Sequence, residues 1–80
     1  ELKALIGDIL KDMNELLTMH DFRIVPGETH TNVIFDVVVP FQVKETNQEL
    51  LDELIHRVRE KKGKTYYLVV TFDRAYTSNI

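Results

Sequence analysis

The sequence predicts one α+β domain with the element order αββαβ, in which a three-stranded mixed sheet carries both helices on one face. Two observations lead to this prediction. Apolar residues recur at helical spacing in residues 1–16 and 46–62, and β-branched residues concentrate in residues 33–39 and 66–72. A chain of 80 residues is too short for two independent cores and buries only about 60% of its unfolded surface, so we expect a thin margin of stability.

The first helix is predicted from about residue 1 to residue 16, with Gly7 as its weak position. Its apolar residues fall three and four positions apart and therefore share one helical face. They are Leu2, Leu5, Ile6, Ile9, Leu10, Met13, Leu16 and Leu17. A first strand follows over about residues 20–25 and ends at Pro26-Gly27, a dipeptide typical of a turn.

The second strand is predicted from Val33 to Val39 and ends at Pro40, because proline cannot donate to a sheet ladder. Apolar residues occupy both of its faces except at Asp36. This pattern is typical of a central strand covered on both sides.

Residues 46–49, Thr-Asn-Gln-Glu, have the form of a capping box that begins the second helix. Its apolar stripe comprises Leu50, Leu51, Leu54, Ile55 and Val58. Lys61 and Lys62 suit the negative end of a helix, and Gly63 is the expected cap. The last strand is predicted from Tyr66 to Phe72, and residues 74–80 are predicted to form a polar tail.

Composition restricts the classes of function. The absence of cysteine excludes disulfides and thiolate sites, so imidazole and carboxylate groups would have to hold any metal. A net charge of −3 argues against a nucleic-acid surface. No apolar run approaches the roughly 18 residues of a membrane span. The chain begins at Glu1 and enters helical periodicity at once, which predicts a domain excised from a longer protein.

Two helices on one face leave the other face of the sheet open. The first two strands should pair as a hairpin, and a right-handed crossover should make the second and third strands parallel. Alternation then directs Ile34, Asp36 and Val38, with Tyr67, Val69, Thr71 and Asp73, to the open face. An exposed apolar patch is typical of an interface, and two-fold association is the commonest form. We therefore expect a homodimer interface that includes Ile34, Val38, Val69 and Thr71.

Asp36 is a carboxylate among apolar residues, and its desolvation has to be offset by a partner. One alternative is a salt bridge to Arg23 or Arg74. The other is a divalent cation bound by Asp36, Asp73 and a histidine. Such ligands suit zinc and would also admit manganese or iron. The spacing of the residues leaves both alternatives open.

The segment His20-Asp21-Phe22-Arg23 starts a strand directly after an amphipathic helix. A turn with a glycine, an apolar strand with one polar residue, a helix and a final strand ending at Asp73 follow. This arrangement resembles the cytoplasmic C-terminal domain of cation diffusion facilitator transporters, and HDFR resembles the HDLR-like motif of that family. The resemblance covers nearly the whole chain.

The resemblance implies a ferredoxin-like, metallochaperone-like fold and a role that is not enzymatic. Domains of this family dimerise and sense divalent metals at the cytoplasmic face of the cell membrane, tethered to their own transmembrane domain, which exports the metal in exchange for protons. The implied ligands are His20, Asp36, Asp73 and a residue near Glu49. Thr71 stands where the family has the histidine of a His-x-Asp motif, which implies a more oxygen-rich site, or a domain that dimerises without sensing.

His20, His30 and Glu49 have competing roles. His20 is either a metal ligand or a donor to the backbone. His30, within the loop of residues 27–32, is either a further ligand or a solvated loop histidine, and Glu49 is explained by the capping box alone. His56 is predicted to lie on the surface of the second helix.

Two other classes of function would each need specific residues. An acyl-phosphate hydrolase would need an arginine in its anion-binding loop, and nucleic-acid binding would need several exposed aromatic residues beside basic ones. The loop Pro26-Gly27-Glu28 is acidic and lacks this arginine, and Tyr67 alone is too little for nucleic-acid binding.

Overall fold

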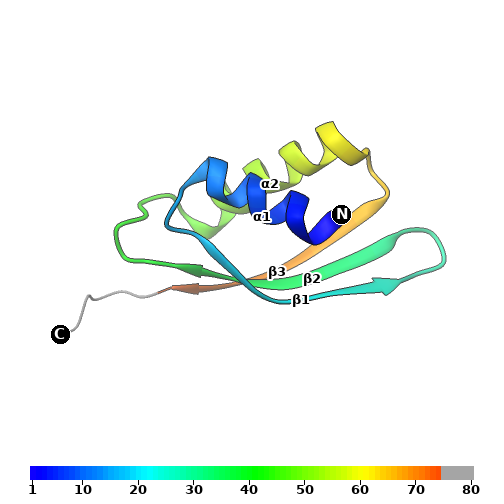
Figure 1. Ribbon diagram of the computed structural model, residues 1–80, viewed down its shortest axis with the longest axis horizontal. Coiled ribbons are helices and arrows are strands. Elements are labelled where there is room, and N and C mark those ends of the chain that lie inside the picture. Colours follow the sequence, from blue (N-terminus) through cyan, green and yellow to red (C-terminus); the bar gives the residue numbers. More distant parts are fainter. Residues whose placement is uncertain (75–80) are drawn as a thin grey trace.

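A computed structural model describes residues 1–74 as two helices packed on one face of a three-stranded sheet (Figure 1). The elements are α1 (Leu2–Met13), β1 (Thr18–Pro26), β2 (Thr31–Val39), α2 (Asn47–Lys62) and β3 (Tyr66–Arg74). The predicted α+β class, the αββαβ order and the mixed sheet are therefore confirmed. Neither helix has the length and apolar character that crossing a membrane would require.

The strand order is β1-β2-β3, so β2 is central as predicted. β1 and β2 are antiparallel and meet at a turn in which the Gly27 N–H donates to the His30 carbonyl oxygen at 3.0 Å. A Cβ atom on Gly27 would lie 2.6 Å from that oxygen, which explains why glycine follows Pro26 here. β2 and β3 are parallel, from Thr31 opposite Tyr66 to Val39 opposite Arg74.

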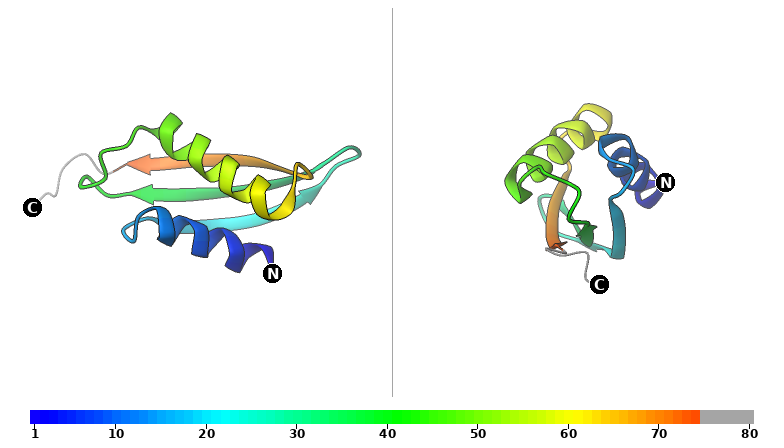
Figure 2. Two further views of the ribbon diagram at one scale, coloured as in Figure 1. Left: turned by 90° about the horizontal axis from the view of Figure 1, so that it is seen from above. Right: turned by 90° about the vertical axis from the view of Figure 1, so that its left-hand side faces the viewer.

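The core lies between the sheet and the helices. Alternate residues of β2 point toward the helices and are completely buried: Val33, Phe35, Val37 and Val39. Facing them are Ile6, Ile9 and Leu10 of α1 and Leu50, Leu54 and Val58 of α2. The predicted apolar stripes of both helices therefore meet one face of the sheet, and Figure 2 shows that both helices lie on the same side.

The first helix is shorter than predicted, because Asn14 ends it. This residue adopts an extended conformation, and its side-chain Oδ1 accepts the Leu16 N–H at 2.9 Å. Leu17 remains buried although it lies beyond the helix, whereas Leu16 is exposed. The prediction of a helix to residue 16 was wrong, since an asparagine whose side chain accepts the backbone N–H two residues on overrides a continuing apolar spacing.

The strands extend beyond their predicted limits, and Arg74 belongs to β3 rather than to the predicted tail. The rest of that predicted tail, residues 75–80, lies outside the described residues. Coverage of β2 on both sides is also not observed within residues 1–74. Ile34, Asp36 and Val38 are only half-buried, because α1 and α2 occupy the opposite face.

The predicted capping box of α2 is present. Thr46 Oγ1 accepts the Glu49 N–H at 3.1 Å, and Glu49 Oε1 accepts the Thr46 N–H at 2.8 Å. Gly63 ends the helix with a positive φ of 72°, a conformation that glycine adopts without strain.

Removing the cap should weaken the fold measurably. We expect Thr46→Ala to lower the free energy of unfolding by about 1 kcal/mol, because the Glu49 N–H loses its acceptor at the helix start. Urea denaturation followed by circular dichroism measures the change. Thr46→Ser keeps the hydroxyl and should retain most of the stability; an equal loss in both variants would contradict the capping role.

Candidate functional site on the open face of the sheet

The face of the sheet opposite the helices carries the candidate site, and we call it the open face (Figure 2). The strand register and the alternating burial of β2 and β3 assign its side chains. The predicted orientation of the β2 and β3 residues toward this face is confirmed. The open face comprises Thr18, His20, Arg23 and Val25 of β1, Asn32, Ile34, Asp36 and Val38 of β2, and Tyr67, Val69, Thr71 and Asp73 of β3.

The register places these side chains in rows across the three strands. His20 lies directly opposite Asp36, and Thr71 lies on the other side of Asp36. Directly opposed residues have Cβ atoms about 5 Å apart, so His20 and Asp36 are neighbours. Asp73 lies opposite Val38, one diagonal step from Asp36. Of the predicted ligands, the fold therefore brings His20 and Asp36 closest together.

A β-bulge in β1 makes this arrangement possible. The register shifts by one residue between His20 and Arg23, and Asp21 within this interval has a φ of 56°. The extra residue puts His20 and Arg23 on the open face, while Met19 and Phe22 both pack on the helix side.

The bulge is stabilised by its own residues. Aspartate tolerates the left-handed region better than most residues. The guanidinium of Arg23 donates to the Asp21 carbonyl oxygen at 3.1 Å. Sequence reasoning missed the bulge, although the three-residue spacing of Met19 and Phe22 in a strand is its signal.

The Asp36 carboxylate has no ion-pair or hydrogen-bond partner among residues 1–74, so of the two alternatives the salt bridge to Arg23 or Arg74 is not observed. Arg23 bonds to the bulge, and Arg74 turns to the helix side, where it donates to Asn47 Oδ1 at 2.8 Å and to the Val43 carbonyl at 3.0 Å. The reason is that Asp36 is half-buried rather than enclosed. A carboxylate that keeps contact with water does not need an ionic partner.

The other candidate ligands lie apart from the His20–Asp36 pair. His30 sits in the turn between β1 and β2, with its ring centroid 5.1 Å from that of Tyr67 and its Nδ1 3.1 Å from Thr29 Oγ1. Glu49 belongs to the helix layer and serves the cap. In the described part of the chain, no three histidine, aspartate or glutamate side chains gather into a group that could hold a metal ion.

His20 is exposed, and its Nε2 lies 3.2 Å from Thr18 Oγ1 on the same strand. Its imidazole is therefore accessible from the open face. An imidazole and a carboxylate side by side on an accessible surface offer one nitrogen and one oxygen donor to a divalent cation.

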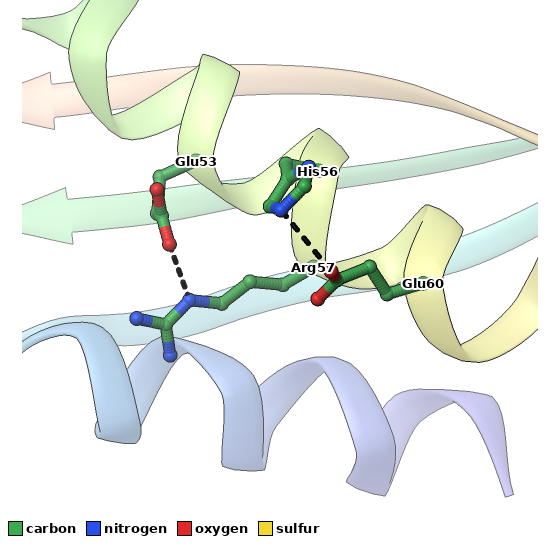
Figure 3. A network of polar contacts seen from close by, with 4 residues as sticks. All are labelled: Glu53, His56, Arg57 and Glu60. Atoms are coloured by element: carbon green, nitrogen blue, oxygen red, sulfur yellow. Dashed lines mark hydrogen bonds and ion pairs between the residues drawn. The ribbon is translucent and has the colours of Figure 1, made fainter.

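A separate network of charged side chains runs along α2 (Figure 3). Arg57 Nε lies 2.6 Å from Glu53 Oε2, and His56 Nε2 lies 3.3 Å from Glu60 Oε2. The hydrogen bond from Arg57 lowers the pKa of the Glu53 carboxyl group. His56 is exposed, as predicted. These pairs one helical turn apart form a solvated helix surface in the helix layer, away from the open face.

Comparison of the chain with protein-family models, with curated proteins and with solved structures gives no match. The function therefore has to be inferred from the chemistry of the chain's own residues.

Proposed function

We propose that this chain is a cytosolic, non-catalytic domain that forms a homodimer through the open face and binds a divalent cation there. This is the role of the cytoplasmic domain in transporters of the cation diffusion facilitator type. The observation that carries the proposal is the His20–Asp36 pair, a nitrogen and an oxygen donor directly opposed across β1 and β2 on the open face.

The apolar part of the open face supports dimerisation. Ile34 and Val69 are opposed in the row next to the pair, and Val38 lies on its other side. Val69 and Tyr67 are among the most exposed large apolar residues of the domain. Covering this surface with a second copy removes apolar area from water, and each Å² contributes about 25 cal/mol.

The number of ligands supports a cation shared between two copies. A zinc site uses three or four protein ligands, and one chain offers the His20–Asp36 pair. Two chains related by a two-fold axis supply two such pairs, and Asp73 of each adds a carboxylate one diagonal step away. Zinc suits the imidazoles best, and the oxygen content would also accept manganese or iron. A cation that binds the dimer better than the monomer shifts the population toward the dimer.

The proposal predicts that zinc or manganese stabilises the folded dimer. Ligand at 100 times its dissociation constant should raise the free energy of unfolding by about 2.7 kcal/mol. Calorimetric titration, melting temperature and sedimentation measure binding, stability and association. His20→Ala and Asp36→Asn should each abolish the response. His56→Ala is the matched control, because His56 is an exposed histidine on α2 that pairs with Glu60.

The absence of both heat and a melting shift with either metal would refute cation binding. A second candidate, a purely structural dimerisation domain, is favoured by the lack of a three-ligand group within residues 1–74. Asp36→Ala with Asp73→Ala separates the two. Loss of the metal response with an intact dimer supports sensing, whereas a tighter dimer without these carboxylates supports the structural role.

A further inference from the structure

β3 is an edge strand, and no strand formed by residues 1–74 pairs with its outer side. The Thr31 N–H donates to the Thr65 carbonyl oxygen at 3.1 Å, so residue 65 directs its backbone toward β2. Strand residues alternate in the side to which they direct their N–H and C=O groups. The residues with backbone groups directed to the free edge are therefore Tyr66, Leu68, Val70, Phe72 and Arg74.

This edge lacks the features that protect sheet edges from pairing. Natural proteins use bulges, prolines and charged residues for this purpose. The other edge strand, β1, has the bulge at Asp21 and ends at Pro26. β3 has no proline, glycine or lysine, its register with β2 is unbroken, and its only charges are the two residues at its end.

The helix side of β3 is incompletely covered. A shallow groove runs between α2 and β3, lined by Leu51 and Ile55 of α2 and by Tyr66 and Leu68 of β3. All four side chains are only partly buried. α2 crosses the sheet obliquely, with its first turn at the β3 edge and its last turn over the middle of the sheet (Figure 2).

We infer that the β3 edge pairs antiparallel with β3 of a second copy, about a two-fold axis at Val70, to give a continuous six-stranded sheet. In this register Val70 faces Val70, Leu68 faces Phe72 and Tyr66 faces Arg74. All five free-edge residues of each copy then have hydrogen-bonding partners.

The sequence of β3 fits a second copy of itself. Its nine residues are centred on Val70, and the charged residues at one end meet the tyrosines at the other end. Asp73 lies opposite Tyr67 and Arg74 opposite Tyr66, so no like charges face each other. The oblique α2 also suits this symmetry. The last turn of α2 lies away from the β3 edge, and in the dimer the first turn of the partner's α2 lies over this part of the edge. The partner helix then covers the groove at Leu51 and Ile55.

This interface is separate from the open face and independent of cation binding. The axis runs perpendicular to the sheet, so both open faces remain accessible on the same side of the extended sheet. EDTA removes the contribution of a cation to association through the open face, and the position of a cross-link then distinguishes the edge interface from contact through the apolar part of that face.

Cysteine cross-linking tests the register, because the chain has no cysteine of its own. Hydrogen-bonded antiparallel partners have Cα atoms about 5.5 Å apart, within the range of a disulfide. Val70→Cys should give a covalent dimer under mild oxidation. The edge interface does not allow Thr71→Cys to cross-link, because Thr71 faces Val69 across the edge and the partner's residue 71 is a diagonal step further. Cross-linking of Thr71→Cys alone would indicate contact through the open face and would overturn the edge interface.

A second pair of variants tests the backbone bonds. Val70→Pro removes the central N–H of the free edge. Val70→Ala also shortens the side chain but keeps this N–H. We expect sedimentation equilibrium to show at least about tenfold weaker dimerisation for Val70→Pro than for Val70→Ala, both folded by circular dichroism. Equal dimerisation of the two, or a Val70→Cys variant that gives no covalent dimer under oxidation, would refute the inference. Either result would leave the metal response of the open face unaffected.

Discussion

Replacing Phe35 by alanine is expected to lower the free energy of unfolding by about 3–5 kcal/mol. Phe35 is completely buried at the centre of β2, and its ring stacks on Phe22 with centroids 6.0 Å apart. Helix residues such as Leu10 and Leu54 belong to the same buried cluster, so removal of the ring would leave a cavity enclosed by the core. Domains are stable by only about 5–15 kcal/mol, and one of this size should lie near the lower end. Urea denaturation should therefore show a largely unfolded variant at low denaturant.

Ile34→Ala is the matched control for this change. Ile34 is the neighbouring residue on the same strand, but it points to the open face and is half-buried. We expect a loss well below that of Phe35→Ala. Equal losses would mean that the open face is covered as thoroughly as the helix face, which would contradict the one-sided core.

Deleting Asp21 should have the second largest effect. The bulge allows Met19 and Phe22 to pack on the same side of the sheet although they are three residues apart. Without the extra residue, strict alternation sends one of them to the open face. Full burial of such a side chain contributes about 1.5–3 kcal/mol, and Met19 and Phe22 are half-buried, so we expect a loss toward the lower end of this range. Chemical denaturation measures this loss, and the same deletion should disturb the pairing of His20 with Asp36 and so weaken metal binding.

Asp21→Gly distinguishes loss of the bulge from loss of the aspartate side chain. Glycine adopts the positive φ of this position without strain, so this variant should be at least as stable as the original chain. A loss as large as that of the deletion would show that the carboxylate, rather than the backbone, holds the bulge.

Most of the fold follows from local patterns in the sequence. The β-branched run from Val33 to Val39 predicts a central strand, and the capping box fixes the start of α2 to the residue. The end of α1 could not be placed from apolar spacing, because Leu16 and Leu17 continue the helical pattern past Asn14. The hydrogen bond from the Leu16 N–H to Asn14 Oδ1 decides that boundary, and it ends the helix although the apolar spacing favours its continuation.

The candidate site was predictable in its composition but only partly in its geometry. Alternation in β2 and β3 places Asp36 and Asp73 on one face without knowledge of the register. The opposition of His20 and Asp36 depends on β1, whose alternation is broken by the bulge. Sequence patterns also did not reveal that the Asp36 carboxylate has no partner within residues 1–74, because Arg23 and Arg74 donate to backbone and amide oxygens that spacing does not predict.

The parallel pairing of β2 with β3 has a consequence for the order of folding. The hairpin of β1 and β2 closes over a short turn, whereas β3 reaches β2 only after the whole of α2 has been traversed. Closing the longer loop costs more chain entropy and should come later. Until β3 pairs with it, β2 has one edge with unpaired backbone groups and strongly apolar side chains. Newly made chains should be most prone to aggregate in that interval. A high protein concentration should therefore reduce the yield of folding more than it reduces the solubility of the folded domain.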